Sequence, residues 1–127
     1  MAPAPEAQKS SACVLVVEDE ILIRVLIADE LRAEGFSVVE AATADEALSF
    51  FQAGVQVDLV LSDIKLPGVL NGVDLIRRLR AGAPNLLTVL TSGNSPGVHE
   101  ADAFLPKPYE VRQAVVLIAT LLQKETR

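Results

Sequence analysis

The stretch at residues 13–19, Cys-Val-Leu-Val-Val-Glu-Asp, decides the expected fold of the chain. Five apolar residues, three of them valine, are followed at once by two acids. A short, unbroken apolar run rich in β-branched residues is typical of a strand that is buried on both faces of a parallel sheet. The two acids then fall where the carboxyl end of that strand leaves the sheet.

Further apolar runs and longer helical patterns alternate along the rest of the chain. The runs predict strands at 36–40, 57–61, 86–91 and 103–105. The patterns between them predict helices at 20–34, 43–53, 71–81 and 109–124, the first three ended by glycine or proline. Because parallel strands are joined by right-handed crossovers, this alternation predicts an α/β fold with a doubly wound five-stranded parallel sheet.

Length and composition restrict the class of protein. The chain has 127 residues, half of them apolar, and a net charge of -6. We expect one domain at 12–125, after a flexible N-terminal tail at 1–11. The acidic balance argues against a nucleic-acid surface, which normally shows a basic stripe. With Cys13 as the single cysteine and no apolar run long enough for a bilayer, we expect a cytoplasmic location and no membrane contact.

The side chains that follow the apolar runs carry the chemistry. In a doubly wound sheet, ligands bind beyond the carboxyl ends of the strands, where strand order reverses. We therefore expect a group of acids, hydroxyls and one lysine to meet at that edge, namely Glu18, Asp19, Asp63, Thr91, Ser92 and Lys107.

Three carboxylates held together repel one another unless a cation lies between them. Oxygen ligands with open positions suit Mg²⁺, which completes its shell with water and phosphate oxygens. A carboxylate is also a nucleophile toward phosphorus, and an ammonium and a hydroxyl stabilise the charge of the transferred group. The collection therefore indicates a phosphoryl-acceptor site that uses Mg²⁺.

Four motifs carry a family resemblance. They are Val-Leu-Val-Val-Glu-Asp-Glu at 14–20, Asp-Ile-Lys-Leu-Pro-Gly at 63–68, Thr-Ser-Gly at 91–93 and Leu-Pro-Lys-Pro-Tyr at 105–109. In this order, each after its own strand, they resemble the response-regulator receiver domains of two-component systems, in a chemotaxis-regulator-like, single-domain form. The resemblance covers about residues 13–124 and implies a flavodoxin-like strand order, 2-1-3-4-5.

The resemblance implies a role for each matching position near the metal. Asp63 matches the aspartate that accepts the phosphoryl group. Asp19 matches the acid that binds Mg²⁺ directly, and Glu18 the acid that usually acts through water. The backbone carbonyl of Lys65 would be the third protein ligand. Taken singly, these residues have structural alternatives, since Glu18 and Asp19 can start a helix and Asp63 can serve a turn.

The resemblance also implies switch residues. Ser92 matches the conserved hydroxyl position because a small residue follows it, and Thr91 is the rival for that role. Lys107 matches the lysine that pairs with the acyl phosphate. Phe104 stands at the position of an aromatic switch residue, although an ordinary core role would also explain it.

The implied function is a phosphorylation-dependent switch. It would accept the phosphoryl group from a phosphohistidine of a histidine kinase or a phosphotransferase and signal by protein–protein contacts. Its own chemistry would be self-phosphorylation and autodephosphorylation, so it would not be an enzyme in the usual sense. The alternative is a receiver-like interaction module that is never phosphorylated.

Two other classes fit the residues less well. A phosphatase of the haloacid-dehalogenase type also forms an aspartyl phosphate, but it needs a second Asp two residues later, where this chain has Lys65. A flavodoxin-like cofactor carrier needs a phosphate-binding loop after the first strand, and Glu18 and Asp19 have the wrong charge for that.

The chain departs from the family between Ser92 and Lys107, where it is shorter than most receivers. Gly93, Pro96 and Gly97 oppose a regular helix there, so we expect the fourth helix of the family to be short or absent. An ordering loop would replace it. We also expect Lys65 and Asn94 to tune the lifetime of the phosphorylated state.

The first and last predicted helices are apolar on more than one face. The strand order implied by the resemblance makes them neighbours on one side of the sheet. Their excess apolar surface suggests a partner, either a second copy in a homodimer or the helical domain of a kinase or phosphotransferase. A pair of deeply buried helices is the alternative explanation.

Overall fold

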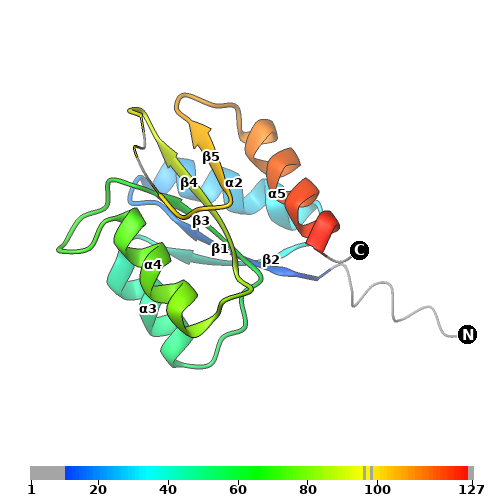
Figure 1. Cartoon of the computed structure of the whole chain (residues 1–127). Helices are drawn as coiled ribbons and strands as arrows, with labels where there is room; N and C mark the ends of the chain where they lie inside the picture. Colours follow the sequence, from blue (N-terminus) through cyan, green and yellow to red (C-terminus); the bar gives the residue numbers. More distant parts are fainter. Residues whose placement is uncertain (1–10, 96, 98, 126–127) are drawn as a thin grey trace, which may run out of the picture.

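A five-stranded parallel sheet forms the centre of the protein. The computed structural model describes residues 11–95, 97 and 99–125, so all of the expected tail except Ser11 lies outside the described residues. The sheet order is β2-β1-β3-β4-β5, which confirms the predicted doubly wound topology (Figure 1). The strands are β1 (Cys13–Val17), β2 (Ser37–Ala41), β3 (Leu59–Asp63), β4 (Leu87–Ser92) and β5 (Ala103–Pro106).

Helices cover both faces of the sheet. On one face lie α2 (Ile21–Ala33) and α5 (Val111–Glu125), and on the other lie α3 (Ala44–Gln52) and α4 (Gly72–Gly82) (Figure 1). Each face buries its own aliphatic core: Val14, Val16 and Leu61 point toward α2 and α5, whereas Leu15 and Val60 point toward α3 and α4. In the described part of the chain, no helix is long and apolar enough to span a membrane.

Local sequence signals place the helix ends. The Thr43 hydroxyl accepts a hydrogen bond from the Glu46 N–H at 3.0 Å, as its position before α3 predicts. At α4, Asn71 and Asp74 form a reciprocal capping box. Such caps satisfy backbone N–H groups that have no partner within the helix, and they hold the start of α4 close to the carboxyl edge of the sheet.

The third strand extends further than the apolar pattern predicts. The prediction of 57–61 ended at the last aliphatic residue, but β3 runs to Asp63, which pairs with Thr91 of β4. Asp58 lies before the strand, where its carboxylate accepts a hydrogen bond from the Cys13 N–H at 2.8 Å. Pairing with β4 therefore carries the backbone of Asp63 into the sheet itself.

The segment between β4 and β5 has no helix in its described residues, 93–95, 97 and 99–102. This confirms the expectation that the family's fourth helix is short or absent; the label α4 belongs to the helix before β4. The segment is tied down at its far end. The Asp102 carboxylate accepts hydrogen bonds from Arg80 at 2.6 Å and from the N–H of Thr88 at 2.8 Å.

Candidate functional site

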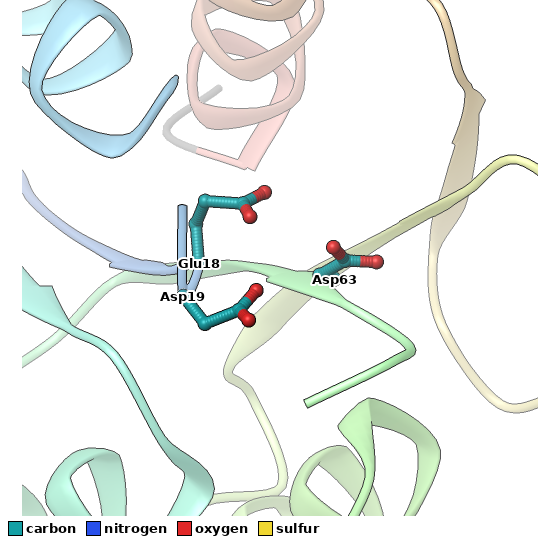
Figure 2. A group of neighbouring side chains, drawn as sticks. All are labelled: Glu18, Asp19 and Asp63. Atoms are coloured by element: carbon teal, nitrogen blue, oxygen red, sulfur yellow. The ribbon is translucent and has the colours of Figure 1, made fainter. Parts of the chain in front are cut away.

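Three carboxyl groups meet at the carboxyl edge of the sheet. Glu18 and Asp19 follow β1, and Asp63 ends β3 (Figure 2). One oxygen of each lies within 4.8 Å of the others. Glu18 is 2% exposed and Asp63 is 7% exposed, whereas Asp19 is open to solvent. The sequence prediction that these acids converge is therefore confirmed.

Lys107 brings a positive charge to the acids from the end of β5. Its Nζ lies 2.8 Å from Oδ2 of Asp63 and 3.4 Å from Oε1 of Glu18. The peptide bond between Lys107 and Pro108 is cis. A single ammonium thus partly neutralises two buried carboxylates that would otherwise repel each other.

The pKa values of Glu18 and Lys107 are both shifted by burial and by the neighbouring charges. Burial raises the pKa of the Glu18 carboxyl, and the charge of Asp63 adds to this effect, outweighing the hydrogen bond from the Glu20 N–H and the attraction of Lys107. Burial lowers the pKa of Lys107, but its hydrogen bond to Asp63 and the charges of both acids outweigh burial, so the net pKa is raised. The cluster therefore keeps an excess of negative charge that a further cation would compensate.

A glycine allows the backbone around Asp63 to pack closely. A Cβ built at Gly72 would collide with the carbonyl oxygen of Asp63. The Gly72 N–H also donates a hydrogen bond to the Ile64 carbonyl at 2.8 Å. The first residue of α4 therefore rests directly on the end of β3, and only glycine leaves room for that contact.

Two hollows flank the Asp63 side chain. One, of about 440 Å³, is lined by the acids and by Pro67. The other, of about 480 Å³, is lined by Ser92, Asn94 and Asn71. Asp63, Lys65 and Lys107 line both hollows. Asp63 is thus accessible from a side rich in carboxylates and from a side rich in neutral hydrogen-bonding groups.

The two hydroxyl candidates at the end of β4 occupy different surroundings. Ser92 lines the hollow of about 480 Å³ that Asn94 and Asn71 also line, here called the neutral hollow. Its Oγ accepts a hydrogen bond from the Asn94 N–H at 3.1 Å. Thr91 is 2% exposed, and its Oγ1 has no hydrogen-bond partner among the residues that the structure describes. Side chains of neighbouring strand residues point to opposite faces, so only one of the two can face the hollow. This geometry favours Ser92 over Thr91.

Phe104 lies away from the acids, on β5. Its side chain is partly buried, with the His99 ring centroid 6.3 Å away at a tilt of 37°. It lines a groove along α5 together with Leu117. The aromatic switch role expected for Phe104 stays a prediction.

One residue at the site was missed by sequence reasoning. Arg24 on α2 donates a hydrogen bond from Nη1 to the backbone carbonyl of Glu18 at 2.8 Å. A signal was present, because Arg24 is the one charged residue within the apolar run 21–27. A buried arginine at such a position is seldom without a partner.

The donor set fits a hard divalent cation. The ligand atoms offered are carboxylate oxygens only, two of the three acids are buried, and the third remains open to water. Mg²⁺ prefers oxygen ligands and keeps several waters, which a half-open cluster of this kind permits. The residues present are therefore compatible with a Mg²⁺ site.

Comparison with known proteins gives the class to which the chain belongs. The family model of the response regulator receiver domain matches residues 14–119. The chain belongs to this family, whose members are the signalling switches of two-component systems rather than enzymes in the usual sense.

Curated relatives match nearly the whole chain. The sensor kinase CckA of Brucella abortus is 36% identical over 123 residues, which are 91% of this chain and 13% of that protein. The alkaline phosphatase synthesis transcriptional regulatory protein SphR of Synechococcus elongatus is 34% identical over 135 residues, which are 94% of this chain and 52% of that protein. The chain thus spans about half the length, or less, of these relatives.

Solved receiver structures share the fold. A CheY-like receiver domain protein from Methanospirillum hungatei superposes with a TM-score of 0.84 at 27% identity, covering 91% of this chain and 97% of that one. The receiver domain of the hybrid histidine kinase CckA superposes with a TM-score of 0.75 at 33% identity, covering 87% and 99%.

Proposed function

We propose that the chain is a phosphorylation-dependent switch that accepts a phosphoryl group on Asp63 with the help of Mg²⁺. The observation that carries this proposal is the contact of 2.8 Å between Lys107 Nζ and Asp63 Oδ2 inside the cluster of three acids. A nucleophilic carboxylate that is oriented by an ammonium and has space on both sides is suited to in-line attack on phosphorus.

In the proposed reaction, the phosphoryl group moves from a phosphohistidine of the donor to Asp63. An oxygen of the Asp63 carboxylate forms the new P–O bond, the P–N bond breaks, and the imidazole nitrogen keeps the electron pair of that bond. The cation would be held by Asp19, Glu18, Asp63 and the backbone carbonyl of Lys65, and it would supply positive charge to the transferred oxygens. Lys107 would then pair with the acyl phosphate.

The neutral hollow is the proposed place of readout. The Ser92 hydroxyl would donate a hydrogen bond to a phosphoryl oxygen, and rotation of the side chain toward that oxygen would move Oγ away from the Asn94 N–H that it accepts from. Since that contact lies at the start of the segment between β4 and β5, phosphorylation would reorder this segment, and Phe104 at its end would follow. Thr91 would contribute by packing beneath the site.

The proposed partners are a histidine kinase or a histidine phosphotransferase, with signalling through protein–protein contacts. The similarity to receiver domains attached to a sensor kinase and to transcriptional regulators supports a partner of this class. Exposed aliphatic side chains on α2 also suit a homodimer formed through α2 and α5. The domain bounds 12–125 and the cytoplasmic location stay predictions.

The test is to incubate the protein with Mg²⁺ and acetyl phosphate and to measure its intact mass. We expect one added phosphoryl group in the wild type, none in Asp63→Asn, and none in the wild type when EDTA removes the cation. An equal adduct in Asp63→Asn would place the phosphoryl group on another residue. No adduct in the wild type would leave the unphosphorylated interaction module as the function.

A further inference from the structure

We propose that Arg24 is a positioning residue that holds the acid pair after β1 in the geometry that binds the divalent cation. This inference rests on the proposed function, because it concerns the same Mg²⁺ site. It adds a residue of α2 that would contact neither the cation nor the phosphoryl group.

The Arg24 guanidinium joins three elements. Nη1 donates a hydrogen bond to the backbone carbonyl of Glu18 at 2.8 Å, and Nε donates one to Oε1 of Glu40 on β2 at 3.3 Å. The Arg24 side chain is only 16% exposed. The planar fork of an arginine can serve two acceptors at once, so its position is well defined by these contacts.

The carbonyl that Arg24 holds belongs to the peptide unit between Glu18 and Asp19. On the other side of Glu18, the backbone N–H donates to the Ala41 carbonyl at 3.0 Å. The backbone on both sides of Glu18 is therefore tied to neighbouring elements. Asp19 is exposed, so the direction of its carboxylate depends on the peptide plane that Arg24 holds.

A positioning role and a purely electrostatic role of Arg24 predict opposite effects of its removal on Mg²⁺ affinity. Arg24 brings a positive charge next to the backbone of Glu18, one of the acids of the cluster, so its removal would by electrostatics alone strengthen the binding of a cation. If Arg24 acts by positioning, its removal weakens the binding instead. Partners that orient ligand residues typically account for ten- to a hundredfold in metal affinity.

The experiment is titration of the full chain with Mg²⁺ by isothermal calorimetry, for the wild type, Arg24→Met and Arg24→Lys. We expect the dissociation constant to rise about tenfold in Arg24→Met. Arg24→Lys keeps the charge, but a single ammonium cannot reproduce both contacts of the fork, so we expect an intermediate loss. At saturating Mg²⁺, the yield of phosphorylated protein with acetyl phosphate should return to the wild-type level in both variants.

The matched control is Arg32→Met. Arg32 also pairs with Glu40, with Nη2 3.2 Å from Oε2, and its loss removes one positive charge of α2 without touching Glu18. We expect its Mg²⁺ affinity to equal that of the wild type. Hydrogen exchange of the Asp19 and Glu20 amides without metal gives a second readout, which we expect to be faster in both Arg24 variants only.

The possible results separate the two proposals. Unchanged or tighter Mg²⁺ binding in both Arg24 variants, with normal binding by the wild type, would overturn the positioning role alone. An equal loss in Arg32→Met would also overturn it, because the effect would then belong to the charge of α2. Absence of Mg²⁺ binding in the wild type would remove the metal site of the proposed function. If Arg24→Met fails to fold, Arg24→Lys carries the test.

Discussion

Tyr109 combines two unusual properties for a single side chain. Its hydroxyl is buried without a hydrogen-bond partner in the described part of the protein. Burial and the negative charge of Glu18 raise the pKa of Tyr109 to about 12. Since the phenolate is penalised in the folded state, Tyr109 links the stability of the protein to pH on the alkaline side.

We predict that the free energy of unfolding falls between pH 10 and 12. Below the ordinary tyrosine pKa of 10.0, the phenol is neutral in both states, so stability is unaffected. Above it, the unfolded chain releases the proton first and is favoured. Ultraviolet absorbance follows this titration without interference, because the chain has one Tyr and no Trp. In Tyr109→Phe the alkaline decline should be smaller; an identical decline would assign it to other groups.

Lys65 is the residue for which we predict an effect on the lifetime of the phosphorylated state. Its side chain is exposed and lines both hollows beside Asp63. The Lys65 ammonium would pair with phosphoryl oxygens and obstruct the attacking water. We therefore expect the dephosphorylation rate of Lys65→Ala to be several-fold higher than that of the wild type. Asn94→Ala should also change the rate, since Asn94 lines the neutral hollow. Rates are measured by loss of the mass adduct after removal of acetyl phosphate; unchanged rates in both variants would exclude tuning by these residues.

At the residue scale, the sequence predicted those site residues that come directly after a predicted strand. Asp63 and Lys107 were found because each comes after an apolar run, and parallel strands end at one edge. The resemblance already preferred Ser92 to Thr91, but which hydroxyl lines the hollow was seen only in the structure, because the face to which a strand residue points depends on register. Arg24 stands out in the sequence as the one charged residue of an apolar run, but its contact with Glu18 was not predictable, because the acceptor is a backbone carbonyl that no side-chain pattern reveals.

At the scale of elements, the described residues between β4 and β5, 93–95, 97 and 99–102, form no helix, and the segment is tethered at its far end. Its tether is Asp102, whose carboxylate accepts from the N–H and hydroxyl of Thr88 and from Arg80. Arg80 also donates to the Glu100 carbonyl at 3.1 Å. One end of the segment is therefore held to β4 and α4, while the other end starts at the proposed phosphoryl-acceptor site.

We predict that Asp102→Ala lowers the free energy of unfolding by about 2 kcal/mol, because it removes several hydrogen bonds to one carboxylate. Arg80→Met should cost less, since Thr88 still pairs with Asp102. Urea denaturation of both variants measures the difference. Stability equal to the wild type in Asp102→Ala would show that the segment is held by other contacts.

Sequence patterns predicted which elements exist better than they predicted where each element ends. The absence of a helix from the described residues between β4 and β5 was predictable because Gly93 and Gly97 act locally on the backbone. The end of β3 was not, because Asp63 joins the strand through its pairing with Thr91, a contact between segments distant in sequence. Local signals therefore located the elements, while long-range pairing determined how far each extends.

At the scale of the whole molecule, α2 presents an apolar stripe to solvent. Ile21 is 61% exposed, Leu22 76% and Leu26 55%, while the opposite side of the helix buries Ile27 and Leu31. Arg112 of α5 pairs with Glu34, the residue that follows α2, at 2.9 Å. The neighbouring placement of the two helices is confirmed, and deep burial of both is excluded.

We predict that the protein forms a dimer through this stripe at high concentration, because association would remove the exposed aliphatic side chains from water. Light scattering measures its size. Leu22→Glu should yield a monomer with unchanged stability, whereas Val69→Glu, at a position 96% exposed elsewhere, should behave as the wild type. A wild type that stays monomeric throughout would exclude the homodimer.

Because β5 is an edge strand, Lys107 is held in the site less firmly than the acids are. Asp63 ends β3, which pairs with β1 and β4, and Glu18 directly follows β1, which pairs with β2 and β3, but β5 pairs with β4 alone. Lys107, which is 89 residues from Glu18 in sequence, depends on that one edge. If β5 detached briefly, the acids would remain in place and the ammonium would leave. Local opening of this one edge strand would thus interrupt the proposed phosphoryl transfer while leaving the proposed cation ligands assembled, so the attachment of the outermost strand would control the reaction.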